Sequence, residues 1–293
     1  MEKAVLEKFI NESCEKLNKT LISFCNNGEK GIKKSELITY WINDYIKYLK
    51  FEEEFIPNKL KIYERGDIVK VNFGFNIGNE EGGLHYAVVL DNKNPQSSGV
   101  ITVVPLSSLK KDEVLSKYEV NLGSELYLLM KNKLDVQRKI AEEAANKFDE
   151  EVILCVNEIN SCREMNDKVE LLDGDKSKIF SLIEERLDFL ENKINKLKEL
   201  RKQNEHKLKY IKKLEREVLK MNKGSKALVG QITTVSKIRI YDPKYGSDIL
   251  SGIKLSPENL DKITKKIADL YIYNVDKLID KEYNVLSNEN SAV

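Results

Sequence analysis

One stretch of this sequence, residues 65–108, rules out a purely helical fold. Within it, residues 67–73 alternate between apolar and polar side chains, residues 86–90 form a short apolar run, and residues 100–106 are mostly β-branched. These patterns are typical of strands, whereas most of the chain on either side has the periodicity of helices. The glycine-rich segment 74–85 joins the first two predicted strands, and we expect the chemistry of the protein there.

The composition describes a chain that can bury a core but has almost no net charge. Of its 293 residues, 41% are apolar and 33% are charged, and the net charge is +1. A nucleic-acid site would therefore have to be a local patch of positive charge. The N-terminus is charged from its second residue, and no apolar run reaches the roughly eighteen residues of a membrane span. We therefore expect a cytoplasmic protein without a signal peptide or membrane segment.

The cysteines and the sequence motifs predict neither a metal site nor a cofactor. Cys14, Cys25, Cys155 and Cys162 form no CxxC pair. The last two would share one helix face, and we expect them to pack as small apolar side chains. The sequence has no Walker-type loop, no HExxH motif and no GxSxG motif.

The N-terminal residues predict two amphipathic helices. Apolar side chains recur at helical spacing over residues 2–25, and an Asn-Asn-Gly sequence then supplies a stop. We expect the second helix to begin near Ser35, as its N-cap, and to end before Pro57. Because two helices alone bury little surface, the pair is predicted to dock on the strand region.

A long block between Ser124 and Lys223 contains no proline and a single glycine. The turn-like residues 172–177 divide it into two helices, which predicts an antiparallel helical hairpin. Apolar residues of the second helix follow a 4-3 alternation with three polar interruptions, which is typical of a coiled-coil seam. The predicted seam positions are 183, 187, 190, 194, 197, 201, 204, 208, 211, 215 and 218.

Charge is distributed unevenly along this predicted hairpin. Residues 142–175 include eleven acidic and three basic side chains, whereas residues 193–216 include ten basic and three acidic ones. When the hairpin folds back on its turn, the two stretches face each other, so we expect mutual neutralisation rather than nucleic-acid binding by the lysine run. The base of the hairpin keeps an excess of positive charge and is the better candidate for contacting phosphates.

Beyond the hairpin, residues 227–235 again have strand character. Ser256 and Pro257 then form a cap and a first turn, which predicts a helix with Leu260, Ile263, Ile267 and Leu270 on one apolar face. The last residues, from 287, are expected to form a loose tail.

Four segments carry motifs that are weak alone and more specific together. They are Arg65-Gly66-Asp67-Ile68, the G-x-E-x-G-G sequence at 78–83 with the apolar residues that follow it, residues 103–108, and residues 228–239. In this order they resemble the MazF/PemK toxins, over about 65–122 and 225–280. The resemblance implies an α+β fold with a small SH3-like β-barrel (MazF/PemK/CcdB-like) and a C-terminal helix, interrupted by a long antiparallel helical hairpin and preceded by added helices.

The resemblance also implies a domain division. The predicted parts are a helical extension at 1–60, the MazF/PemK-like barrel domain at 61–122 plus 225–285, the coiled-coil hairpin insertion at 123–224, and a tail at 286–293.

The resemblance implies an activity and a set of partners. Members of the family are typically homodimeric, sequence-specific, metal-independent endoribonucleases that an antitoxin holds in check. The expected partners are therefore RNA, an antitoxin protein and a second copy of the chain, with no membrane and no DNA bound by this chain alone. Cleavage would proceed by attack of the 2′-hydroxyl, giving a 2′,3′-cyclic phosphate and a 5′-hydroxyl. Single-stranded RNA is favoured because its bases must splay out to be read.

Two residues are candidates for catalysis. The family usually has a catalytic arginine followed by a proline at this place, and this sequence has His85 and Tyr86 instead. RNA cleavage needs proton transfer and stabilisation of the phosphorane charge, and histidine, with an unperturbed pKa of about 6.5, suits proton transfer. Ser107 takes the place of a family threonine and keeps its hydroxyl; Ser108 is the alternative if the alignment slips by one residue.

Further residues are candidates for RNA binding or for shaping the groove. Gln231 is retained from the family pattern, whereas Thr233 replaces an arginine, and Lys237 and Arg239 are expected to compensate for that loss. His206 lies in the lysine-rich helix and is expected to be solvated. The predicted RNA-binding residues are Asn79, Glu80, Glu81, Ser108, Gln231, Thr233, Lys237 and Arg239.

Two other functions remain open at this point. The barrel could bind a protein or ribonucleoprotein target without catalysis, using its surface and the coiled-coil arm. It could also be only a platform for a coiled-coil adaptor. Cleavage of a defined RNA with mapped ends distinguishes the enzyme from both alternatives.

Overall fold

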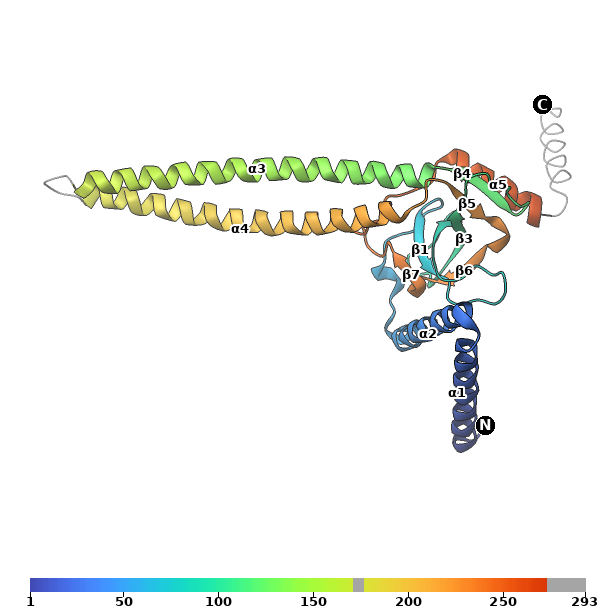
Figure 1. Ribbon diagram of the computed structural model, residues 1–293. Coiled ribbons are helices and arrows are strands. Elements are labelled where there is room, and N and C mark those ends of the chain that lie inside the picture. The colour runs from blue at the N-terminus through green and yellow to red at the C-terminus, as the bar shows by residue number, and fades with distance from the viewer. Residues whose placement is uncertain (171–176, 273–293) are drawn as a thin grey trace, which may run out of the picture. The chain divides into compact units, whose positions relative to one another are not determined.

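The computed structural model describes residues 1–170 and 177–272, and the chain divides into two compact units. The first unit combines residues 1–123 with the chain from residue 224 onward, and the second comprises residues 124–223. The first holds every strand, and the second consists of two long helices (Figure 1). The structure is therefore a mixed α+β fold, as the sequence predicts.

The first unit is built on one antiparallel sheet of seven strands. Its continuous order is β4-β5-β3-β2-β1-β7, and β6 pairs with β3 outside this path. The strands are β1 (Ile68–Asn72), β2 (Leu84–Val89), β3 (Val100–Ser108), β4 (Glu119–Gly123), β5 (Ser225–Leu228), β6 (Thr233–Ser236) and β7 (Ile240–Asp242).

Strand β3 is paired along both of its edges. One edge pairs with β2, with Ala87 opposite Pro105. The other edge pairs first with β6, from Val100 to Val103, and then with β5, from Leu106 to Ser108. Pro105 lies where the partner changes, a position where its missing N–H is tolerated. No ladder joins β4 to β7 among the described strands, so the sheet is not closed, and the SH3-like barrel remains a prediction.

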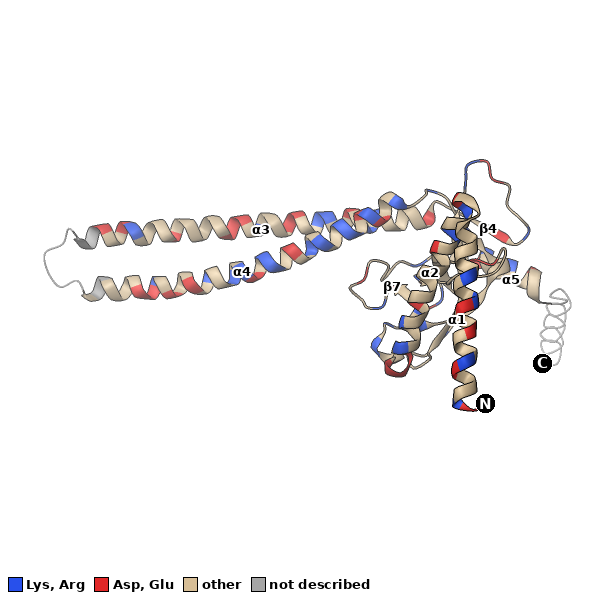
Figure 2. Cartoon of the chain, turned by 60° about the horizontal axis from the view of Figure 1, so that its bottom comes forward, with Lys and Arg blue, Asp and Glu red and all other residues tan. Residues whose placement is uncertain are grey.

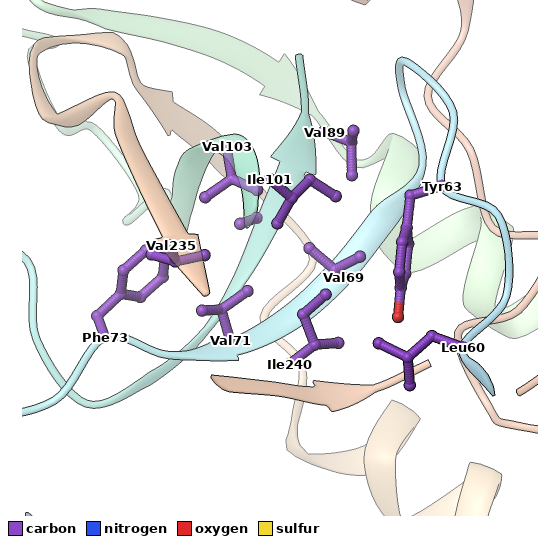
Figure 3. Close-up of a cluster of buried hydrophobic side chains, with 11 residues drawn as sticks. Leu60, Tyr63, Val69, Val71, Phe73, Val89, Ile101, Val103, Val235 and Ile240 are labelled. Atoms are coloured by element: carbon purple, nitrogen blue, oxygen red, sulfur yellow. The ribbon is translucent and has the colours of Figure 1, made fainter. Parts of the chain in front are cut away.

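The main apolar core lies on one face of this sheet (Figure 3). Because side chains alternate along a strand, every second residue of β1, β2 and β3 points into the core. Each fully buried Val or Ile contributes about 1.5–3 kcal/mol relative to an exposed one. The cluster comprises Leu60, Tyr63, Val69, Val71, Phe73, Ala87, Val89, Ile101, Val103, Val235 and Ile240.

The strand pattern of residues 65–108 predicts the sheet well. The three expected runs coincide with β1, β2 and β3 to within a few residues. The expected strand at 227–235 is wrong as one element, because the 3-10 turn Val229–Gln231 (η3) separates β5 from β6. Strands β4 and β7 were not expected, since each is short.

Two helices, α1 (Lys3–Cys25) and α2 (Gly28–Phe51), precede the sheet. The prediction that the second helix starts near Ser35 is wrong, since Ser35 lies buried inside α2 and donates its hydroxyl to the carbonyl oxygen of Leu21, at 3.0 Å. Gly31 lies in the first turn of α2. Gly31 is needed there because a Cβ would come 2.0 Å from the carbonyl oxygen of Phe24 on α1.

Only one of the two helices docks on the strand region in the way that the sequence predicts. In α2, Asp44 and Tyr48 both bond to the side chain of Asn72 at the end of β1. Helix α1 contacts α2 instead, and none of its residues is buried. Its apolar side chains, such as Phe9 at 55% exposure, face solvent.

The predicted C-terminal helix is confirmed as α5 (Pro257–Tyr271). The Ser256 hydroxyl accepts the backbone N–H of Asn259 at 3.4 Å, which satisfies one of the donors at the helix start. Ile263 is fully buried on its apolar face. The predicted tail at 286–293 lies outside the described residues.

The second unit consists of α3 (Glu125–Glu170) and α4 (Ser177–Lys220), which lie side by side and run in opposite directions (Figure 1). The predicted turn at 172–177 lies outside the described residues except for Ser177. Cys155 and Cys162 are free and buried, which confirms that they pack as small apolar side chains. No helix within the described residues has the length and apolar character to cross a membrane.

Ion pairs join the two long helices. Arg186 and Lys193 on α4 reach Glu158 and Glu151 on α3, at 3.3 Å and 3.7 Å. Arg138 on α3 pairs with Glu215 on α4 at 2.5 Å. Figure 2 shows that basic residues concentrate on the C-terminal half of α4. Of these pairs, only Lys193–Glu151 joins the predicted acidic stretch to the predicted basic one.

The structure corrects the phase of the predicted coiled-coil seam. Of the eleven predicted positions, three (190, 211 and 218) are buried and four are partly buried, whereas 187, 194, 201 and 208 are exposed. At several of the exposed positions the residue one earlier is less exposed: Arg186, Lys193 and Leu200 are partly buried, and Leu214, before the partly buried 215, is buried. Long basic side chains can lie along a seam on their aliphatic stems while their charged ends pair with carboxylates. A pattern of apolar residues does not reveal such positions.

We expect the core of the sheet to be sensitive to loss of side-chain volume. Replacing Ile101, which is 1% exposed, by alanine should lower the free energy of unfolding by about 2–5 kcal/mol, because it leaves a cavity. The neighbouring Val100, which is 50% exposed, offers a matched control, and Val100→Ala should change it by less than about 1 kcal/mol. Urea unfolding followed by circular dichroism measures both, and equal effects would contradict the core assignment.

Candidate functional site

The glycine-rich segment between β1 and β2 is tied at its base. The Phe73 N–H donates to the carbonyl oxygen of Gly83 at 2.8 Å, and the Gly83 N–H donates to that of Gly74 at 2.6 Å. Gly74 and Gly83 have φ of +85° and +82°, which side chains of L-residues rarely adopt. A Cβ on Gly74 would also come 2.7 Å from the Trp41 ring. The glycines therefore allow both the tight turn and the close approach of α2.

The side chain of Gln231, which is about 150 residues away in sequence, is bonded to this loop. Its Oε1 accepts the backbone N–H of Glu81 at 2.8 Å, and its Nε2 donates to the carbonyl oxygen of Asn79 at 2.8 Å. Both ends of the amide are therefore bonded to the loop backbone. Gln231 was expected to contact RNA, but in this structure its amide positions the loop.

His85 and Glu81 form a pair at the end of the loop. His85 lies at the start of β2, and its Nε2 is 3.1 Å from Glu81 Oε1. The His85 side chain is 35% exposed and that of Glu81 is 20% exposed, so solvent and a ligand can still reach the imidazole. When Nε2 carries the proton and donates it to the carboxylate, Nδ1 keeps a free lone pair. A carboxylate that orients an imidazole in this way is a common arrangement in proton-transfer sites.

His85 and Ser107 both lie just beyond the ladder that joins β2 to β3. That ladder ends at Ala87 and Pro105, and β3 pairs with β5 from Leu106 onward. Because side chains alternate along a strand, Ser107 and Ser108 point to opposite faces of the sheet. The joint action of His85 and Ser107 therefore stays a prediction.

A lysine that the sequence does not single out lies beside Ser107 on the next strand. Lys226 of β5 is opposite Ser107 in the ladder, and its Nζ lies 2.8 Å from Glu113 and 2.7 Å from Glu119. The hydrogen bonds that Lys226 donates to these carboxylates raise its pKa, and the bond from Lys226 lowers the pKa of Glu119. Its charge is therefore already balanced within the protein.

A cavity of about 550 Å³ opens between α2 and the glycine-rich loop. His85 and Glu80 lie in its wall, together with backbone of the loop. The opposite wall is formed by side chains of α2. The α2 residues that line it are Leu37, Tyr40, Trp41 and Asp44.

Of the predicted RNA-binding residues, Lys237 is buried and Arg239 is partly buried. Lys237 is 1% exposed and donates to the carbonyl oxygen of Pro95, and burial lowers its pKa. Arg239 stacks on Trp41, with 5.3 Å from its guanidinium carbon to the ring centroid, and donates to the carbonyl oxygen of Asn72. Burial lowers the pKa of Arg239 as well. The prediction that Lys237 faces RNA is therefore wrong. Arg239 instead packs against Trp41 and supports α2.

The remaining predicted residues have simpler positions. Asn79 and Glu80 are exposed on the loop, and Ser108 is exposed at the end of β3. Thr233 begins β6 opposite Val103 and is partly buried. Within the described part of the chain, no three His, Cys, Asp or Glu side chains are grouped to hold a metal ion.

The contribution of α2 to this site was not predicted from the sequence. Positions 37, 41 and 44 share one helix face, and the only tryptophan of the chain marks it. That spacing predicts an apolar contact surface, but it does not show that the glycine-rich loop lies against it. Only the bond between Asp44 and Asn72 and the contact of Trp41 with Gly74 reveal this.

The fold and the site together define a small antiparallel-sheet domain with a glycine-rich loop and a histidine–carboxylate pair. A family model described as a PemK-like, MazF-like toxin of type II toxin–antitoxin systems matches residues 64–162. The match covers β1 to β4 and the first part of α3, and it does not include the resembling segment beyond residue 224. A search of curated proteins finds no match to this chain.

The likeness to the PemK-like, MazF-like toxin family is therefore carried by residues 64–162, which are less than half of the chain. Helices α1 and α2 lie before the matched residues, and α4 and α5 lie after them.

We expect the Gln231 amide to be the main restraint on the loop. Gln231→Leu removes two hydrogen bonds, each worth about 0.5–1.5 kcal/mol net, so the Glu81 amide should exchange with solvent roughly tenfold faster. Hydrogen exchange of peptides covering residues 75–84 measures this. Gln203→Leu, at an exposed position of α4, is the control and should leave the exchange unchanged. Unchanged exchange in Gln231→Leu would contradict the assignment.

Proposed function

We propose that the protein is a metal-independent endoribonuclease that cleaves single-stranded RNA, of the messenger class, through attack of the 2′-hydroxyl. The observation that carries this proposal is the pairing of His85 Nε2 with Glu81 Oε1 at 3.1 Å, at the end of the glycine-rich loop. Toxins of the PemK family are generally endoribonucleases, which supports the same reaction class.

The residues divide the chemistry between them. His85 Nδ1 accepts the proton of the 2′-hydroxyl while the 2′-oxygen forms its bond to phosphorus. The bond from phosphorus to the 5′-oxygen then breaks, leaving a 2′,3′-cyclic phosphate, and the His85 imidazolium is the donor available to protonate the 5′-oxygen. The Ser107 hydroxyl donates to a non-bridging phosphate oxygen. Glu81 orients the imidazole and offsets its positive charge.

The other parts of the proposal extend from the family. We propose the domain division of residues 1–60, 61–122 with 225–285, 123–224 and 286–293, with an SH3-like barrel in the second part. Helices α3 and α4 would form a coiled-coil arm for a partner or a target. An antitoxin would control the activity, and the active form would be a homodimer in the cytoplasm.

One observation favours a second candidate function. Apolar side chains along α1, including Val5, Phe9 and Ile22, are each about half exposed. An exposed apolar face of this kind is more typical of a protein-binding surface than of a nuclease. The alternative is therefore a non-catalytic toxin or interaction module that binds a protein or ribonucleoprotein target.

The experiment that decides between them is RNA cleavage with mapped ends. The purified protein should cut defined single-stranded RNAs in the presence of a chelator, and mass spectrometry should find 2′,3′-cyclic phosphate and 5′-hydroxyl ends. His85→Ala should lower the rate by about 10²–10⁴, the usual loss when a proton-transfer group is removed. His206→Ala, at an exposed position of α4, replaces the only other histidine and should leave the rate unchanged. Full activity of His85→Ala would falsify the catalytic assignment, and inactivity of the wild type across varied RNAs would favour the second candidate.

The role of Glu81 has its own kinetic signature. Glu81→Gln keeps an oxygen that can accept the His85 N–H, whereas Glu81→Leu removes it. We expect kcat to fall in the order wild type, Glu81→Gln, Glu81→Leu, with a loss of roughly ten- to a hundredfold for the leucine and little change in KM. If KM rises while kcat holds, Glu81 contacts RNA directly and does not act through His85.

A further inference from the structure

The cavity between α2 and the glycine-rich loop has a wall that lies outside the residues matched to the toxin family. That wall consists of the α2 residues, which precede residue 64. We propose that this cavity binds an unpaired nucleobase that carries an exocyclic amino group, namely adenine, cytosine or guanine, next to the cleaved phosphate. The inference rests on the proposed function, because it places this base beside the reaction at His85.

The shape and the aromatic lining of the cavity suit a base. A volume of about 550 Å³ lies within the range of small-ligand sites. Tyr40 is 64% exposed and lines the cavity, so its ring is available to stack on a base without moving. Stacking on aromatic side chains is the usual way in which proteins hold unpaired bases. Leu37, which is 48% exposed, extends the same apolar wall.

The charges around the cavity favour a base over a phosphate. Its lining residues include no lysine and no arginine, but they include two acidic residues, Asp44 and Glu80. Asp44 already accepts hydrogen bonds from Asn72 and Lys47, but a carboxylate has about four acceptor sites and can take another donor. An amino group can supply that donor. Uracil carries a carbonyl oxygen where cytosine carries its amino group, and its one donor on that edge, N3–H, lies between two carbonyl oxygens that would face the carboxylates unfavourably.

The wall is held in place before any ligand arrives. Trp41 packs on Gly74, stacks with Arg239 and has the rings of Tyr45 and Tyr48 at 5.8 Å and 6.1 Å. A rigid wall loses little freedom on binding, which favours affinity. His85 lines the same cavity, so a base held there lies within one nucleotide of the proposed chemistry.

The single tryptophan gives a direct test that does not depend on cleavage. Trp41 is the only tryptophan of the chain and lines the cavity, so its fluorescence reports occupancy. We would titrate the full chain with 2′-O-methyl hexanucleotides of adenine, cytosine or uracil, which lack the attacking hydroxyl. Adenine and cytosine oligomers should change the fluorescence with an affinity at least tenfold higher than uracil oligomers. Tyr40→Ala should weaken their binding by roughly tenfold, and Tyr241→Ala, which is 60% exposed on β7 and does not line the cavity, should not.

The outcomes separate this inference from the proposed function. Three results would each overturn the base site: equal binding of adenine and uracil oligomers, no change in Trp41 fluorescence, or unchanged binding by Tyr40→Ala. A Trp41 fluorescence change on adding a protein partner, with none on adding any oligonucleotide, would overturn it as well. Selective binding without cleavage of any RNA would overturn the nuclease and leave the base site standing. Cleavage of RNA by the wild type without any change in Trp41 fluorescence would support the nuclease and overturn the base site.

Discussion

The structure depends on the pairing of β3 along both of its edges. One edge is completed by β2, which is close in sequence, and the other by β5 and β6, which follow residues 124–223. A strand with a free edge leaves unpaired backbone groups, so the sheet domain is incomplete until the chain has passed through both long helices. The core shows the same dependence, because Val235 and Ile240 complete the apolar cluster that β1, β2 and β3 begin.

The candidate site is also formed by residues from distant parts of the sequence. His85 comes from the segment before the long helices, and Gln231, which holds its loop, comes from the segment after them. A third segment, α2, closes one side of the cavity through Trp41. Three distant parts of the sequence therefore meet at the glycine-rich loop. A change in any of them can alter the chemistry at His85 without touching it.

Sequence patterns predicted the elements better than their contacts. The alternation of residues 67–73 and the cap at Ser256 were sufficient to find β1 and α5, since both signals are local. The start of α2 was missed because Ser35 was interpreted as an N-cap, whereas the helix begins directly after Asn26-Asn27, at Gly28. Lys237 looked like a surface cation, since a sequence does not show that Pro95 and the Tyr63 ring cover it.

The sequence by itself determined the strands, the long helices, the glycine-rich loop and the position of His85 within it, because periodicity, turn residues and short motifs are properties of neighbouring residues. Tertiary structure alone decided what each of these residues does. It bonded the Gln231 amide to the loop, paired His85 with Glu81 and set α2 against Gly74. The physical reason is that hydrogen bonds, burial and stacking join atoms that are close in space. The separation of two residues along the chain does not show whether their atoms are close in space.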